Sequence, residues 1–472
     1  MASTILAEIS RPDLLDLSTP PLASITDVKH LSSYNWIEAP TPTIAVPGSP
    51  SLWSAPRAPR QLKKDSGLIY IAQNAARHPE SPLESLFRAL YIANPSFDIR
   101  SIDIVTDRNN IRKLLSFINP DSTRNGLETF TINIEFAKNT AIFAREETAT
   151  HEFIGLHEFR GFGHEFEKAY TTSQISGSTG HHRIISYRFS DLNFIVRHET
   201  DGYVDAGTRI PSSNSKEPES DSLSSMLESL SLSPTSSPPT GSKLTIREEG
   251  RVIPLESTLE IKTRVSHKPL EIQEVAPQLW VSQTFKLVRA YHHKGIFQRP
   301  EVEDVATLIK RWEKRNQTDL RKLAALITKI LNVVKGYGGN ATVKYDAKDD
   351  KLVVWKVDGK KMLPKDLYSK WDDRDNSEVE TNAAHNAGAE STVKPVDGVE
   401  TKAEGKSIAF SPGDTKGKKA AEPAKEGEQT LPDDLFPNPT PAKDTDSDSQ
   451  DKGGEHLAAD SGETLLSSSS TR

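Results

Sequence analysis

The sequence predicts an α+β domain in which a mixed β-sheet core is flanked by helices, with a disordered insertion and a disordered C-terminal tail. Several segments alternate apolar and polar residues, as half-buried strands do. Other segments repeat apolar residues every three or four positions, as amphipathic helices do. Two long stretches hold mainly Ser, Pro and charged residues, which cannot bury a core.

Strand patterns occur along the whole predicted domain. Residues 130–136 alternate phenylalanine or isoleucine with polar residues, and residues 141–144 return after a turn at Lys138-Asn139, which predicts a hairpin. Residues 341–345 and 351–357 predict a second hairpin. Short apolar runs predict further strands at residues 68–71, 103–105, 183–189, 194–196, 244–247 and 255–264.

Apolar residues at helical spacing predict the helices that cover the sheet. Pro82 is a favourable first-turn residue for a helix that carries Leu83, Leu86, Phe87 and Leu90 on one face. The same spacing predicts helices at residues 111–118, 159–170, 275–291, 302–315 and 320–335.

Composition sets the expected domain boundaries. We expect a loosely ordered N-terminus at residues 1–30 and one catalytic domain at residues 31–372. Within this domain, residues 211–242 are rich in Ser and Pro and predict a disordered insertion. Residues 373–472 are charged, with almost no aromatic residues, and predict a disordered tail.

Composition also excludes several classes of site. The 472 residues include no cysteine, which excludes disulfides, thiolate zinc sites and cysteine nucleophiles. The net charge of −7 gives no global nucleic-acid signature. No apolar run has membrane-spanning length and the N-terminus lacks a signal-peptide pattern, so we expect a soluble intracellular protein. Lys416-Gly417-Lys418-Lys419 is a weak nuclear-import candidate, so the expected location is nuclear, cytoplasmic or both.

The strand at residues 255–264 carries the pattern around which we place a candidate site. Residues two apart on a strand share a face, so Glu260 and Lys262 project together while Ile261 points into the core. This pair suits metal-assisted phosphodiester chemistry, because a carboxylate holds a hard divalent cation and an ammonium orients water or phosphate. The ordinary alternative is a surface salt bridge of little consequence.

Further carboxylates follow neighbouring elements. Glu199 and Asp201 come at the end of the strand that includes residues 194–196 and share a face, so two adjacent strands could place carboxylates around one cation. Glu167 lies at the edge of the apolar stripe of the helix predicted at residues 159–170. It is either another carboxylate aimed at the strands or an ordinary solvated helix residue.

Two more polar residues complete the candidate set. Gln283 falls on the stripe of the helix predicted at residues 275–291, three positions after Trp280. A buried amide needs a partner, so it contacts either phosphate and water or the backbone. Arg108 stands at a strand-to-helix junction, where a helix N-terminus favours phosphate; a capping or salt-bridge role is the alternative.

These elements carry five motifs whose order resembles a known family. They are Arg108 after a strand, Gly163-His164-Glu165-Phe166-Glu167, Glu199-Thr200-Asp201, Glu260-Ile261-Lys262-Thr263 and Trp280-x-x-Gln283. Over about residues 31–360, the sequence resembles the DXO-like decapping exoribonuclease family, a branch of the PD-(D/E)XK nuclease superfamily. The resemblance implies a PD-(D/E)XK-type mixed sheet. Departures from the family pattern at Asp107, His164 and Thr200 indicate a diverged member.

The resemblance also implies roles for the candidate residues. Mg²⁺ or Mn²⁺ would be held by Glu167, Glu199, Asp201, Glu260 and the carbonyl group of Ile261. The catalytic residues would be Asp201, Glu260, Lys262 and Gln283, and the contacts to substrate would come from Arg108, Lys262 and Gln283. The family removes triphosphates and incomplete or non-canonical caps, NAD caps included, from RNA 5′ ends, and some members then degrade RNA from 5′ to 3′. The expected partners are RNA 5′ ends and, as a candidate, a 5′-to-3′ exoribonuclease.

The same residues allow two other functional interpretations. The motif set is shared across the superfamily, so a DNA nuclease is the first alternative. The three departures motivate the second, a catalytically inactive RNA-binding or scaffold protein. The intact set Glu167, Asp201, Glu260 and Lys262 favours an active metal-dependent hydrolase over the inactive alternative.

Overall fold

The computed structural model of the chain describes residues 4–120, 127–155, 157–205, 235–236, 241–359 and 361–372. The predicted tail, with Lys416–Lys419, lies outside the described residues. So does the predicted insertion, apart from residues 235–236 and 241–242. No helix in the described ranges is long and apolar enough to cross a membrane.

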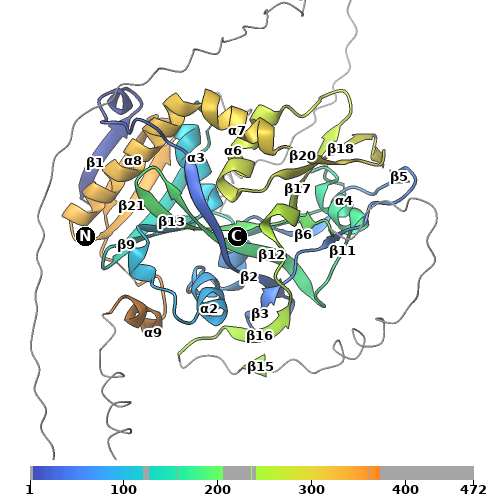
Figure 1. Cartoon of the computed structure of the whole chain (residues 1–472), viewed down its shortest axis with the longest axis horizontal. Coiled ribbons are helices and arrows are strands. Elements are labelled where there is room, and N and C mark those ends of the chain that lie inside the picture. The colour runs from blue at the N-terminus through green and yellow to red at the C-terminus, as the bar shows by residue number, and fades with distance from the viewer. Residues whose placement is uncertain are drawn as a thin grey trace, which may run out of the picture. The chain divides into compact units, whose positions relative to one another are not determined.

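A large mixed sheet forms the centre of the domain (Figure 1). In spatial order its strands are β1 (Ile5–Ser10), β22 (Lys351–Lys356), β21 (Asn340–Asp346), β8 (Phe130–Ala137), β9 (Thr140–Glu146), β7 (Ile104–Asp107), β13 (Leu192–Glu199), β12 (Ser178–Phe189), β2 (Ile25–Ile37), β3 (Thr43–Gly48), β16 (Thr245–Gly250) and β15 (Thr235–Ser236). Strand β7 runs parallel to both of its neighbours, whereas most other pairs are antiparallel. The sheet is therefore mixed, as predicted.

A second sheet lies beside the first and contains the Glu-x-Lys strand. Its order is β11 (Thr171–Thr172), β4 (Leu52–Trp53), β14 (Gly202–Tyr203), β17 (Thr258–Val265), β18 (Lys286–His293), β19 (Ile296–Phe297) and β5 (Arg60–Gln61), with β20 (Val302–Asp304) against β18. A separate two-stranded sheet pairs β6 (Gly67–Tyr70) with β10 (His151–Ile154). Strand β13 leads directly into β14, so the chain passes from one sheet to the other at Thr200-Asp201.

Helices cover both faces of the large sheet (Figure 1). They are α1 (Gln73–Arg77), α2 (Glu84–Ala93), α3 (Arg108–Ile118), α6 (Ile272–Ser282), α7 (Ala306–Arg315), α8 (Gln317–Gly336) and α9 (Lys365–Tyr368). Helix α4 (Gly163–Tyr170) packs on the second sheet instead. The larger apolar core joins α3, α6, α7 and α8 to one face, and Phe130, Ile132 and Ile134 of the alternating strand point into it. A second core joins α2 to the other face. The α+β class and the flanking helices are confirmed.

The N-terminus differs from the sequence-based expectation. Loosely ordered residues were expected up to residue 30, but β1 pairs with β22 at the edge of the large sheet. Ile9 and Leu14 are only 2% exposed and belong to the larger core. The expectation is wrong because the partner strand lies more than 300 positions away, where local periodicity carries no information.

Three predicted helices are shorter than expected. The segment at residues 275–291 is helical only to Ser282, and residues 286–293 form β18, parallel to β17. Helix α6 is thus the usual crossover connection between two adjacent parallel strands. The helix predicted at residues 302–315 begins at Ala306, because residues 302–304 form β20 against β18.

The helix predicted at residues 159–170 begins at Gly163, because Gly161 has a φ of 124°, which no helix accommodates.

Candidate active site

Glu260 lies at the centre of a buried polar network on β17. Its side chain is on the same face as Lys262, as strand geometry requires, and the residue is only 2% exposed. One carboxylate oxygen accepts hydrogen bonds from Lys262 Nζ and from the Gln278 amide. The other oxygen accepts from Arg108 Nη1 at 3.2 Å. The predicted pair is therefore part of a buried network and is not a surface salt bridge.

Asp201 is attached to the same strand through its backbone. Its Oδ2 atom accepts a hydrogen bond from the Ile261 amide at 2.7 Å. Gly202 then pairs with Leu259 in the second sheet. A side chain at Gly202 would approach the Ser51 carbonyl to 2.9 Å, so the absence of a Cβ lets this crossing between sheets lie close to β4.

Glu167 and Glu199 approach the network from two other elements. Helix α4 packs against β17 through Phe166, which is fully buried, and Glu167 is half-buried beside it. Glu199 is the last residue of β13 and its side chain is exposed. Glu167 is close enough to Asp201, Glu199 and Glu260 for all three charges to act on it. Three elements and one connecting loop thus bring four carboxylates together.

The carboxylates titrate very differently. Burial opposes ionisation of Glu260, but Lys262 and Arg108 outweigh it and lower the pKa of Glu260 to about 2. Loss of solvent and the nearby Glu260 charge raise the pKa of Asp201 to about 7. Burial and then the Asp201 and Glu199 charges raise the pKa of Glu167 well above its usual value. Partial loss of solvent around its carboxylate and the Glu260 charge raise the pKa of Glu199, whereas Arg108 opposes the rise.

Arg108 connects the carboxylates to a pocket on the large sheet. It is the first residue of α3, which follows β7 directly. Asp107 accepts two hydrogen bonds from the buried guanidinium of Arg197, at 2.6 and 3.0 Å, and these fix the junction. Asp107, one of the departures from the family pattern, therefore has a structural partner.

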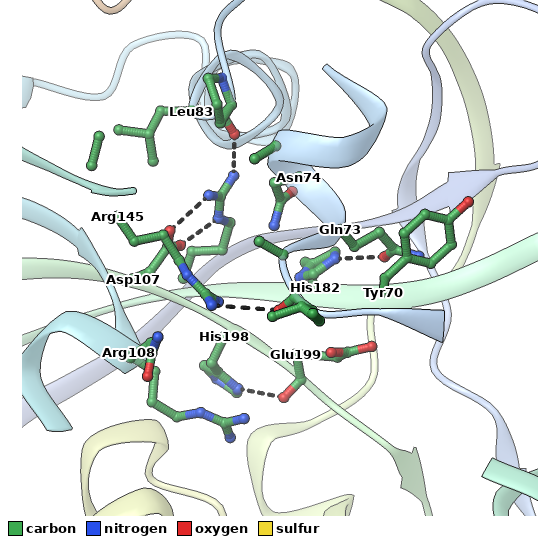
Figure 2. Close-up of a pocket in the computed structure, with 17 residues that line it drawn as sticks. Tyr70, Gln73, Asn74, Leu83, Asp107, Arg108, Arg145, His182, His198 and Glu199 are labelled. Carbon is green, nitrogen blue, oxygen red and sulfur yellow. Dashed lines mark hydrogen bonds and ion pairs between the residues drawn. The ribbon is translucent and has the colours of Figure 1, made fainter. Parts of the chain in front are cut away.

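The pocket itself is lined by both polar and small apolar residues. Figure 2 shows Asp107, Arg108 and Arg145 on one side and Gln73 and Asn74 on the other. The apolar part of the lining consists of Ile71, Ala72, Ala75, Pro82, Leu83 and Ala144. Glu199 also lines the pocket, so its opening adjoins the carboxylate cluster. The other two departures lie outside these contacts, since Thr200 bonds through its backbone to His181 and His164 is exposed.

A glutamine other than Gln283 contacts Glu260 in the structure. Gln283 ends α6 in a left-handed conformation with a φ of 53°, and its amide donates to the Trp280 carbonyl. Gln278, one turn earlier, donates to Glu260. The alternative role considered for Gln283, a buried amide bonded to backbone, is the one observed. The sequence could have indicated Gln278, because residues 275, 278 and 282 have the spacing of one helix face, and all three are buried.

The donor set fits a hard divalent cation. Carboxylate and carbonyl oxygens are the preferred ligands of Mg²⁺ and Mn²⁺. A cluster of carboxylates with raised pKa values is also the expected electrostatic state of such a site without its cation. Among the described residues, however, no three acidic or histidine side chains are already arranged around a common point that could hold a metal ion. Glu260 has both oxygens occupied by cationic and amide donors instead.

Comparison with known proteins identifies the family. The family model described as "Domain of unknown function (DUF8563)" matches residues 3–371. The chain belongs to this family. No curated protein sequence matches the chain.

The DUF8563 domain is similar in structure to Rai1 and Dxo1 proteins. Candida albicans Rai1 in complex with pU5-Mn²⁺ is 13% identical, with a TM-score of 0.46 over 78% of this chain and 98% of that chain. Scheffersomyces stipitis Rai1 in complex with (3′-NADP)⁺ and calcium is 12% identical, with a TM-score of 0.47 over 75% and 97%. K. lactis Dxo1 in complex with manganese is 10% identical, with a TM-score of 0.39 over 75% and 97%. These likenesses concern the fold alone.

The titration of Asp201 gives a first testable prediction. The folded DUF8563 domain holds a proton on Asp201 up to about pH 7, whereas the unfolded chain releases it near 3.8. Ionisation of Asp201 therefore opposes folding, and stability should fall as pH rises from about 4 to about 7. In EDTA we expect this residue to contribute a decrease in Tm on the order of 5 °C. Thermal unfolding across this range measures it.

Two variants and the addition of Mn²⁺ test whether Asp201 causes the decrease of Tm with rising pH. Asp201→Asn should flatten the decrease, whereas Asp191→Asn, whose side chain is 87% exposed, should leave it unchanged. Mn²⁺ should raise Tm more at pH 7 than at pH 5, because a bound cation favours ionised carboxylates. Part of the slope should remain, because the pKa values of Glu167 and Glu199 are also raised. An unchanged slope in Asp201→Asn would refute this assignment.

Proposed function

We propose that the described domain is a divalent-metal-dependent hydrolase that acts on RNA 5′ ends. The observation that carries this proposal is the convergence of Glu167, Glu199, Asp201 and Glu260 on a face that also holds Lys262 and Arg108. A cluster of carboxylates beside cations that could contact phosphate suits phosphodiester or pyrophosphate hydrolysis. The choice of RNA 5′ ends follows the order of the five sequence motifs.

Each residue has a role that follows from its contacts. The four carboxylates and the Ile261 carbonyl would hold Mg²⁺ or Mn²⁺, which stabilises developing charge and makes bound water more acidic. Glu260 is ionised at neutral pH, because Lys262 and Arg108 hold its pKa at about 2. The Gln278 amide fixes the orientation of this carboxylate. Because Gln278 contacts Glu260, we assign to it the role first expected of Gln283, namely orienting the attacking water and the scissile phosphate.

Lys262 and Arg108 would act on the substrate phosphate. Both donate to Glu260 and lie on different sides of its carboxylate. If Glu260 held a cation instead, Lys262 Nζ and Arg108 Nη1 would be available to donate to phosphate oxygens. Arg108 also lines the pocket in Figure 2, so the first RNA nucleotide would enter there, with its phosphate at Arg108.

A panel of substrates tests the proposal. RNAs bearing a 5′-triphosphate, a cap intermediate or an NAD cap, together with single-stranded DNA, would be incubated with Mg²⁺, Mn²⁺ or EDTA. We expect release of the 5′ group from at least one RNA with Mg²⁺ or Mn²⁺, and none in EDTA. Cleavage of DNA alone would favour the DNA nuclease alternative. RNA binding with no turnover of any substrate would favour the inactive binding protein.

A further inference from the structure

The two-stranded sheet of β6 and β10 exposes an apolar pair beside the candidate site. Leu68 and Phe153 lie directly opposite each other in its register and are 53% and 74% exposed. Cross-strand apolar pairs usually face a core, where they stabilise the sheet. This pair faces outward, while the neighbouring Ile154 is 1% exposed and buried on the other side. The outward pair therefore adds nothing to the described core.

Strand geometry places two ring side chains on the same face. Residues two apart share a face, so Tyr70 joins Leu68 on β6 and His151 joins Phe153 on β10. Tyr70 and His151 are also direct partners in the register. We call this face, made of Leu68, Tyr70, His151 and Phe153, the ribbon face. On each strand, this face carries one ring side chain next to one apolar or aromatic side chain, about 7 Å apart.

The ribbon face is continuous with the pocket that contains Arg108. Tyr70 belongs to both, since it lines the pocket and ends β6 (Figure 2). The guanidinium of Arg77 lies 5.0 Å from the centre of the Tyr70 ring. Lys63 and Lys64 precede β6, but they contact Glu165 and the Phe159 ring. Arg77 is therefore the cation that the structure places against the face, at the ring that joins it to the pocket.

We propose that the ribbon face stacks the bases of single-stranded RNA whose first nucleotide lies in the Arg108 pocket. This inference rests on the proposed function and extends it to the strand beyond the first nucleotide. Proteins recognise single-stranded RNA largely by stacking unpaired bases on aromatic side chains, with basic residues along the backbone. The Tyr70 ring has Arg77 against it and lines the same pocket as Arg108, which matches that requirement. A protein interface would need a larger apolar area.

Binding of RNAs of two lengths tests the inference. The probes are 5′-monophosphate oligoadenylates of two and eight nucleotides with a 3′ fluorophore. Anisotropy is measured with Ca²⁺ in place of Mg²⁺ or Mn²⁺, so that a cation can occupy the carboxylates, and intact probe is verified after each measurement. Phe153→Ala should weaken binding of the longer RNA by roughly 5- to 50-fold and leave the shorter RNA unchanged. Phe153→Trp should retain binding of the longer RNA, because it preserves the stacking surface.

The matched control is Tyr337→Ala, since Tyr337 is an exposed aromatic (55%) at the end of α8. It should change neither affinity. Equal weakening of both RNAs, unchanged binding of the longer RNA, or no binding to the wild type would each overturn the inference. Loss of self-association in Phe153→Ala with unchanged RNA binding would assign the face to a protein interface instead. Length-dependent binding without hydrolysis in the substrate panel would support the ribbon face while refuting the hydrolase proposal.

Discussion

Glu260→Gln is expected to reduce the release of 5′ groups from RNA by about 10³-fold or more. The glutamine side chain has nearly the same shape but no charge, so it is a poor ligand for a hard cation. It also leaves Lys262 and Arg108 without the carboxylate that both now contact. Initial rates with saturating Mn²⁺, measured on the RNA identified by the substrate panel, give the size of the effect.

Folding must be checked, because removing one partner from a buried charge network costs about 3–5 kcal/mol. Circular dichroism and thermal unfolding distinguish loss of the site from loss of the fold. Asp201→Asn provides a second test with the same expected loss, since Asp201 is bound to the Ile261 amide of the same strand. Glu248→Gln, on the exposed side of β16, should keep full activity. A folded Glu260→Gln protein with more than a tenth of the wild-type rate would refute the proposed site.

Gln278→Leu is expected to lower kcat by about 10²-fold, while Gln283→Gly should leave it within about twofold. Gln278 donates directly to Glu260, and leucine has a similar size but no amide. Gln283 donates only to the Trp280 carbonyl and has a φ of 53°, a conformation that glycine adopts without strain. Comparing kcat and KM of the two variants separates the two residues.

The two glutamines control for each other, because both belong to the same short helical segment. A general disturbance of α6 would lower the stability and activity of both proteins together. If kcat fell strongly in Gln283→Gly and stayed near the wild-type value in Gln278→Leu, the catalytic role would belong to Gln283. A shift in the pH dependence of kcat in Gln278→Leu would show that the amide acts through the ionisation of Glu260.

The sequence by itself determined the features that depend on local geometry. Alternation over residues 130–136 predicted a strand that faces the core, and it is β8. The two-residue spacing of Glu260 and Lys262 predicted a shared face, because side chains alternate along any strand. The order of the five motifs indicated a fold like that of decapping enzymes, and the chain is similar in structure to Rai1 and Dxo1 proteins.

Only the tertiary structure decided which polar residues meet. Gln278 and Gln283 lie five positions apart on similar apolar stripes. Helix α6 ends before Gln283, and it is Gln278 that donates, with Arg108, to Glu260. The pairing of β1 with β22 and the bond from Ile261 to Asp201 join segments far apart in the chain. Periodicity reports which face of an element is apolar. The partner of a polar side chain is determined by the packing of distant elements, because a buried polar group must find its hydrogen bonds there.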